Sequence, residues 1–286
     1  SNPTTREIAP ASAIAGKVTH STTITNNGQD NEGTNNNPLS FTIADDAANA
    51  AVRPVTGPVS VTYTPPGGGA AVITTIQPTV ANGNIYTLNT TTLPGGIAPG
   101  GVLAINYKVS SGNVTTPATV ADAAAVGSTE TTIVTLIPAG VGAPDRTTVT
   151  DTTNVKGLTL LKQAAVQVNC TGTILPYQGE LKADGSATIL TTSAKPGDCI
   201  YYKITANNTF TSISGTSLAG VTLSDLTNQW KSRSTYQSGT ATGGTGDGSV
   251  TIANSGNAST EAVTTNLGTL ANGATGSMTF FIKVNP

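Results

Sequence analysis

Charged residues are scarce in this chain. Only 10% of its 286 residues are Asp, Glu, Lys or Arg, well below the ~25% of a typical soluble domain. The formal net charge is -2, so the chain has neither the basic field that attracts nucleic acid nor a strong acidic field. We therefore expect no nucleic-acid partner.

Long apolar runs and aromatic side chains are also missing. Hydrophobic residues make up 37% of the chain, but they alternate with Thr and Ser and nowhere form the ~20 consecutive apolar residues of a transmembrane helix. We therefore expect no membrane span. Aromatic residues make up only 4%, and Trp230 is the single tryptophan, which leaves little material for the exposed aromatic platform of a carbohydrate-binding module.

Residues suited to catalysis or cofactor binding are equally few. His20 is the only histidine, and one histidine without an orienting partner is weak evidence for a Ser-His-Asp site. The acidic, Asn-rich loop at residues 26–35 offers the oxygen ligands that Ca²⁺ takes. It lacks the spacing of a calcium loop, so we expect a solvated loop. We expect no enzyme activity, no metal and no cofactor.

The cysteines and the first residues indicate export. The chain begins Ser1-Asn2-Pro3, and its single methionine is Met278, which we interpret as a secreted form whose signal has been removed. In that compartment the default for Cys170 and Cys199 is one disulfide, with two buried free thiols as the alternative.

Short Asn-x-Ser/Thr matches arise by chance in a chain rich in Thr and Asn, but in a secreted protein they are candidate glycan acceptors. They lie at Asn89, Asn113, Asn169, Asn207 and Asn257.

Short alternating segments separated by turn signals predict strands along most of the chain. Val59, Val61 and Tyr63 share one face of a strand, and a Pro-Pro-Gly-Gly-Gly turn follows it. Many such strands indicate an all-β fold of two immunoglobulin-like β-sandwich domains in tandem. We place an N-terminal extension at residues 1–30, the first sandwich at residues 31–152 and the second at residues 153–286.

The end of the chain repeats a phrase from its middle but stops earlier. Residues 267–286 resemble residues 97–109, and the middle copy continues into a Thr/Val strand at residues 112–122. We therefore predict that the second sandwich lacks a strand, and that residues 16–26, which have the same character, are a donor strand for it. We expect strand 277–284 to be the acceptor edge. The inward side chains of the donor are Val18, His20, Thr22 and Ile24, and those of the acceptor are Met278, Phe280, Ile282 and Val284.

The second half of the chain resembles the repeat known as the domain of unknown function eleven, which occurs in prokaryotic surface proteins. The resemblance covers roughly residues 157–286. It rests on Pro-Gly-Asp at residues 196–198 before an alternating strand, Val-Thr-Leu-Ser-Asp at residues 221–225, and Leu-Gly-Thr-Leu-Ala-Asn-Gly at residues 267–273. It implies immunoglobulin-like sandwiches strung along a cell-surface polypeptide. The family's last strand stands here at the N-terminus, as residues 15–30, so the pattern is circularly shifted.

These observations predict a structural subunit of an extracellular, pilus-like filament on the cell surface. A donated strand pairs the free backbone groups of the next copy, and a head-to-tail contact that does not close produces a fibre of identical subunits. Two alternatives remain open. The N-terminal strand closes the first domain within its own chain, giving a surface-layer or adhesin module without strand exchange, or the chain is one segment of a longer repeat array. A Lys162–Asn285 isopeptide is not expected, because no buried acid is identifiable beside the pair.

Overall fold

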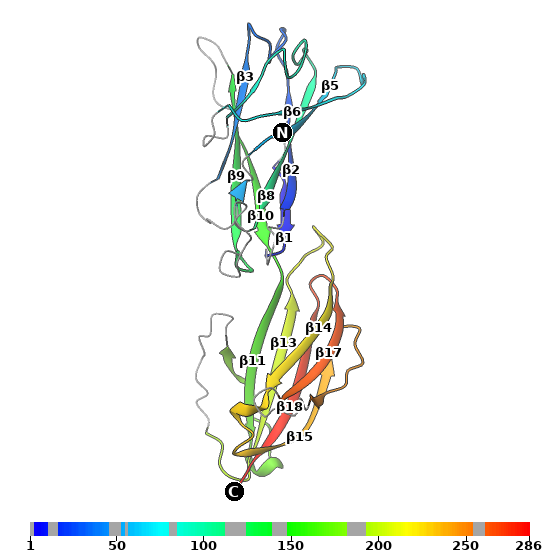
Figure 1. The fold of residues 1–286 in the computed structure, drawn as a ribbon. Coiled ribbons are helices and arrows are strands. Elements are labelled where there is room, and N and C mark those ends of the chain that lie inside the picture. Colours follow the sequence, from blue (N-terminus) through cyan, green and yellow to red (C-terminus); the bar gives the residue numbers. More distant parts are fainter. Residues whose placement is uncertain are drawn as a thin grey trace. The chain divides into compact units, whose positions relative to one another are not determined.

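Extended backbone dominates because Thr, Val and Ile, which favour strands, alternate with polar residues. A computed structural model describes residues 3–10, 17–45, 53–54, 57–79, 85–111, 124–138, 148–181, 193–253 and 261–286. Within these ranges the only helices are two short 3-10 turns, η2 (Val168–Cys170) and η3 (Thr227–Gln229). The predicted all-β class is confirmed. The strands group into two compact units, Ser1–Lys156 and Gly157–Pro286, each with its own sheets (Figure 1).

The first unit has two sheets that enclose one hydrophobic core (Figure 1). One sheet contains, in spatial order, β1 (Thr5–Ile8), β10 (Thr148–Val155), β9 (Thr129–Pro138), β3 (Leu39–Asp45) and β7 (Ile85–Leu88). The other contains β2 (Lys17–Thr25), β8 (Val102–Ser110), β5 (Val59–Thr64) and β6 (Val72–Ile76), with the short β4 (Arg53–Pro54) beside β8. Strands β1 and β10 run parallel, and the other pairs are antiparallel.

The strand order of this unit is that of an immunoglobulin sandwich. In that fold, strands B, E and D of one sheet face strands C, F and G of the other. Here β2, β8 and β5 occupy the B, E and D positions, and β3, β9 and β10 occupy the C, F and G positions. The N-terminal strand β2 is therefore an integral strand of the first unit.

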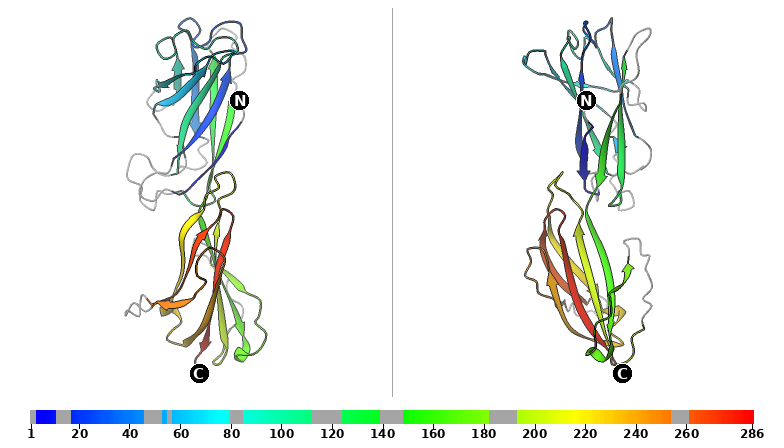
Figure 2. Two further views of the ribbon diagram at one scale, coloured as in Figure 1. Left: turned by 90° about the vertical axis from the view of Figure 1, so that its right-hand side faces the viewer. Right: turned by 180° about the vertical axis from the view of Figure 1, so that it is seen from behind.

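The second unit also has two sheets around one core (Figures 1 and 2). The larger contains, in order, β12 (Gln178–Leu181), β11 (Leu158–Gln167), β13 (Cys199–Asn208), β18 (Thr275–Val284) and β15 (Ser234–Thr242). The smaller contains β14 (Leu218–Leu226), β17 (Ala262–Leu270) and β16 (Thr251–Ala253). All pairs in both sheets are antiparallel.

The N-terminal region differs from the sequence prediction. Residues 1–30 are not a separate extension, because β1 and β2 are strands of the first unit. Along the chain, the boundary between the two units lies between Lys156 and Gly157, and not after residue 152 as predicted. The strands expected at residues 112–122 and 187–191 fall outside the described residues.

Candidate strand-pairing surfaces

The predicted donor strand, β2, is paired inside its own unit. It runs antiparallel to β8, with His20 opposite Tyr107. Its four predicted side chains do face a core: His20 and Thr22 are fully buried, and Val18 and Ile24 are partly buried against the same cluster. That core belongs to the first unit. The expectation of a spare strand is therefore wrong for this structure, because the backbone of β2 is already used by β8.

A buried carboxylate holds the N-terminal strands in place. Asp151 of β10 accepts hydrogen bonds from the Tyr107 hydroxyl at 2.5 Å, the Thr22 hydroxyl at 3.0 Å, and both the backbone N–H and the hydroxyl of Thr4, at 2.6 and 2.8 Å. Burial, followed by the hydrogen bond to Asp151, raises the pKa of Tyr107. The carboxylate thus joins β2, β8 and β10 to the segment that leads into β1.

His20 completes this network in a neutral form. Its Nδ1 lies 2.7 Å from the Thr4 hydroxyl, and its Nε2 lies 2.8 Å from the Thr153 hydroxyl. The Thr4 hydroxyl gives its single proton to Asp151, so it accepts from Nδ1–H, and Nε2 of the neutral ring accepts from Thr153. Burial lowers the pKa of His20, and the nearby Asp151 charge opposes this only in part. His20 and Asp151 are both 0% exposed, so the network ties strands together and keeps its imidazole and its carboxylate away from solvent.

The predicted acceptor strand, β18, is a central strand. One edge pairs with β13 and the other with β15. Met278, Phe280 and Ile282 are buried in the core, and the backbone N–H of Val284 donates to the Asp198 carbonyl. The prediction that this strand is the acceptor edge is therefore wrong, since both of its edges carry ladder hydrogen bonds within the unit.

The two units share one strand plan. Strands β13, β14, β15, β17 and β18 have the pairing order and antiparallel sense of β2, β3, β5, β7 and β8. A side-chain amide marks the same place in each. Asn26 after β2 donates to the Ile97 carbonyl at 2.7 Å, and Asn208 at the end of β13 donates to the Leu270 carbonyl at 3.1 Å. Ile97 lies in the loop before β8, and Leu270 is the last residue of β17, directly before the turn into β18. The two similar sequence phrases stand at these places.

The described residues of the second unit contain no counterparts of the two strands that finish this plan. In the first unit β9 pairs with the edge of β3 that faces away from β7, and β10 pairs with β9. In the second unit the corresponding edge of β14 pairs with no strand of the described residues. The smaller sheet therefore covers only part of the larger one.

On one face of the larger sheet, side chains become more exposed from β18 through β13 to β11. Phe280 on β18 is 1% exposed, and its cross-strand neighbour Tyr202 on β13 is partly buried. On β11, Leu160 lies opposite the buried Ala206 of β13, on the same face. Leu160 is nevertheless 51% exposed, and Leu158 two residues earlier is 37% exposed. We call this uncovered part, bounded by Leu158, Leu160, Tyr202 and the free edge of β14, the open side of the second unit.

One ion pair crosses the open side. The Lys162 Nζ on β11 lies 2.7 Å from Oδ1 of Asp225 on β14 and 5.0 Å from the centre of the Tyr202 ring. The second oxygen of Asp225, Oδ2, is buried and accepts no hydrogen bond from the described residues. A buried acceptor without a donor costs about 1–3 kcal/mol. Lys162 is not paired with Asn285, whose side-chain oxygen accepts from the Thr235 hydroxyl.

The predicted disulfide is confirmed. Cys170 and Cys199 are joined, with their Cα atoms 4.9 Å apart. Beside it, the Asp198 carboxylate accepts from the backbone N–H groups of Asn169 and Lys195 at 2.9 and 2.8 Å, and these bonds lower the pKa of Asp198. The bridge fixes the start of β13 to the turn after β11.

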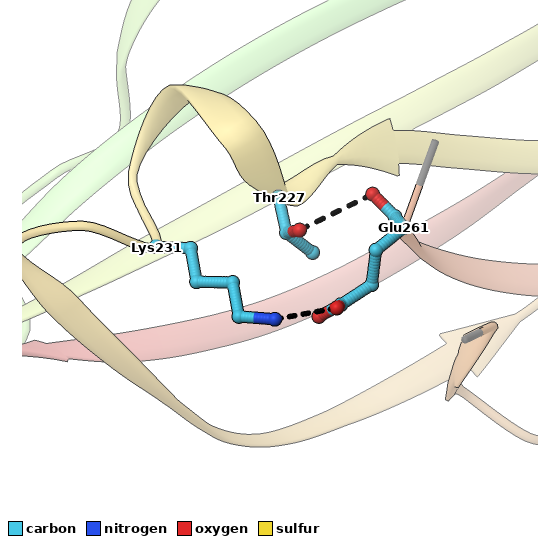
Figure 3. A network of polar contacts seen from close by, with 3 residues as sticks. All are labelled: Thr227, Lys231 and Glu261. Carbon is cyan, nitrogen blue, oxygen red and sulfur yellow. Dashed lines mark hydrogen bonds and ion pairs between the residues drawn. The ribbon is translucent and has the colours of Figure 1, made fainter. Parts of the chain in front are cut away.

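A second candidate surface lies around Trp230. The Lys231 Nζ lies 2.5 Å from Oε2 of Glu261, and the Thr227 hydroxyl donates to the Glu261 carbonyl at 3.2 Å (Figure 3). These contacts fasten the η3 turn to the start of β17. They border a pocket of about 350 Å³ whose lining includes Trp230 and Tyr236. Trp230 is only 9% exposed and belongs to the core, so it closes the sandwich and offers no stacking platform.

The predicted loop at residues 26–35 is used for structure. Asn26 donates from Nδ2 to the carbonyls of Asp30 and Ile97, and its Oδ1 accepts from the Gly28 N–H. No three His, Cys, Asp or Glu side chains gather as a metal site within the described ranges. Of the glycan acceptor candidates, Asn113 and Asn257 fall outside those ranges.

Comparison with known proteins identifies no relative. No protein-family model matches the chain, and no curated protein sequence matches it. The resemblance to the surface-protein repeat thus stays a prediction. Among the helices that the structure describes, none has the length and apolar character needed to cross a membrane.

Proposed function

We propose that this chain is a non-catalytic structural subunit of an extracellular, cell-surface filament whose copies are joined by strand complementation. The observation that carries the proposal is the open side of the second unit, whose described residues repeat the plan of the first without counterparts of β9 and β10. An exposed strand edge beside uncovered apolar side chains is a template for an added strand. The contact joins two different surfaces, and such a contact generates a filament when it does not close.

Composition and chemistry support an extracellular setting. A disulfide persists in oxidising compartments, and the resemblance to repeats of prokaryotic surface proteins favours the cell surface. The charged groups at the core of the first unit are sealed from solvent, which fits a structural role. The sequence prediction assigned the acceptor edge to β18; the proposal assigns it to the free edge of β14.

The second candidate is a surface-layer or adhesin module that is complete within one chain. The observation that favours it is the position of β2, which closes the first unit of its own chain by pairing with β8. In that case the protein has no strand to give, and the open side stays uncovered or is filled without polymer formation.

Electron microscopy combined with size-exclusion chromatography separates the two candidates. The filament proposal predicts fibres for the unmodified protein and none for Leu160→Asp, because a charge on the open side opposes apolar contact. Ile73→Asp is the matched control, since Ile73 is 73% exposed on the edge strand β6 of the first unit. It should leave the fibres unchanged. Monomers of the unmodified protein at every concentration would favour the closed module.

A further inference from the structure

Resting on the proposed filament, the structure also indicates which strand fills the open side. In the first unit, the strand at the equivalent edge, β9, runs antiparallel to β3. An occupant of the β14 edge is therefore expected to run antiparallel to β14. Its inward side chains would face the buried row Val221, Leu223 and Asp225, which are 7%, 2% and 8% exposed.

Strand β2 is a poor donor. All nine of its residues pair with β8, and His20 and Thr22 are fully buried in a hydrogen-bonded network. Its departure would remove the nine-residue ladder on one edge of β8 and take the Thr22 hydroxyl from Asp151. A copy that gave up β2 would open one sandwich in order to close another.

Strand β1 is a better donor. It is four residues long and lies at the edge of its sheet, where β10 is its single strand neighbour in the described part of the chain. When β1 leaves, β2 keeps its ladder with β8, and His20 keeps the hydroxyl of Thr153. Asp151 loses both donors of Thr4 and keeps those of Thr22 and Tyr107. Both β1 and β2 are edge strands, so the first unit then loses a ladder of four residues and not one of nine.

The side chains of β1 match the open side. Thr4 and Ile8 contact the interior of the first unit. Burial does not alternate along β1 in this unit, where Glu7 is buried as well as Ile8, but regular alternation in an added strand would place Arg6 on the face of Ile8. Arg6 is exposed and uses its guanidinium on the carbonyls of Thr19 and Thr5, and neither ion pair of the described residues includes it. The strand thus offers a free cation two residues before an apolar side chain.

We propose that β1 of a second copy adds to the free edge of β14, antiparallel, with Arg6 opposite Asp225 and Ile8 opposite Leu223. The guanidinium then donates to Oδ2 of Asp225, the buried oxygen that accepts no bond from the described residues. Arginine and carboxylate form strong charge-assisted hydrogen bonds. Ile8 extends the apolar cover over the larger sheet.

Disulfide trapping between differently tagged copies tests this register. Opposed residues of an antiparallel pair have Cα atoms about 4.5–5.5 Å apart, within the range that a disulfide bridges. Thr5→Cys mixed with Leu226→Cys, and Ala9→Cys mixed with Thr222→Cys, should each give a cross-linked pair on a non-reducing gel. All four residues are exposed. Ala9→Cys mixed with Leu226→Cys is the mismatched control, since its residues are four positions, about 13 Å, out of register.

Assembly of an Arg6 variant provides a second readout. Arg6→Ala should raise the protein concentration at which fibres appear by about tenfold, the effect of losing one charge-assisted hydrogen bond. Lys17→Ala, which removes an exposed cation at the start of β2, should leave that concentration unchanged.

The outcomes separate this inference from the proposed filament. Cross-links in both matched mixtures and none in the control support the register. Fibres without matched cross-links, or with equal cross-linking in the control, overturn the assignment of β1 and leave the filament standing. A protein that stays monomeric and forms no cross-link overturns both.

Discussion

Two asparagines at equivalent places show how single residues fix the turns of both sandwiches. Asn208 is 0% exposed, and its amide donates to the carbonyls of Thr216, Leu270 and Ala271 at 3.0, 3.1 and 2.9 Å. Three loop carbonyls would lose their donor together if this side chain were removed. The residue therefore holds the turn before β18 against the end of β13.

We predict that Asn208→Ala lowers the free energy of unfolding of the second unit by about 2–3 kcal/mol, at roughly 1 kcal/mol per hydrogen bond. The two N–H groups of the amide, shared among three carbonyls, are lost together with the bond that Oδ1 accepts from the Phe210 N–H. Urea unfolding followed by the fluorescence of Trp230, the single tryptophan, measures the change in stability. The neighbouring Asn207→Ala, at a partly buried strand position, is the control and should change stability by less than about 0.5 kcal/mol. Equal losses for both variants would contradict the role given to Asn208.

His20 predicts a pH dependence of the first unit. Burial lowers its pKa in the folded state below the ordinary value of 6.5. The unfolded state then binds more protons than the folded one below pH 6.5, so stability is full above that pH and falls as the pH drops toward the folded pKa. Thermal unfolding between pH 7.5 and 5 should show this loss, whereas His20→Asn should be nearly flat in that window. A parallel decline in the variant would assign the effect to other groups.

At the residue scale, alternation was enough to predict which side of β2 is buried. Val18, His20, Thr22 and Ile24 lie on one face as expected. The hydrogen bond between His20 and Thr153 and the nearby charge of Asp151 were not predictable, because both residues lie more than a hundred positions from His20 along the chain and no local pattern links them. Sequence periodicity reports burial, and it carries no information on long-range hydrogen bonds.

At the element scale, strand order was the source of the main error. The pattern of β18 correctly placed Met278, Phe280 and Ile282 in a core. It could not tell whether the backbone edges of the strand are free, because side-chain alternation is the same in edge and central strands. Strand β18 is a middle strand in its sheet, and β14 is an edge strand whose second edge pairs with no strand of the described residues.

This assignment predicts a contrast between two apolar residues on one face of the larger sheet. Phe280→Ala should cost about 3–5 kcal/mol, because it empties a fully buried site on a central strand. Leu160→Ala should change the stability of the isolated protein by less than about 0.5 kcal/mol, because half of the side chain is already exposed. Chemical denaturation of monomeric samples measures both. A large cost at Leu160 would mean that the open side is covered in solution.

At the scale of the whole molecule, the repeated phrase was the most informative part of the sequence. It indicated that the two copies hold equivalent places, and the strand plans agree, since β18 matches β8. The described residues of the second unit contain no counterpart of β9 or β10. The donor was harder to assign. Residues 16–26 have the composition of the missing strand, but composition does not reveal that β8 already occupies their backbone.

If each copy carries one donor strand and one acceptor edge, a copy that lacks either of them ends the growth of the filament at one side. A copy truncated to residues 11–286 lacks β1 but keeps β2, so we predict that it accepts a strand, donates none and forms no fibres alone. Added to intact protein in a ratio of about 1:10, it should shorten fibres to roughly ten copies, because each truncated copy ends one chain of subunits. Leu160→Asp, which donates but does not accept, should shorten them in the same way.

Fibre lengths in electron micrographs measure both effects. The control is an equal amount of Ile73→Asp, which keeps donor and acceptor and should leave lengths unchanged. The truncated copy must also be folded, which its circular dichroism and a cooperative unfolding transition establish. Mixing the truncated copy with Leu160→Asp is the strictest case: one accepts and the other donates, so the mixture should give dimers and nothing longer. Long fibres in that mixture would mean that the copies are joined through another surface.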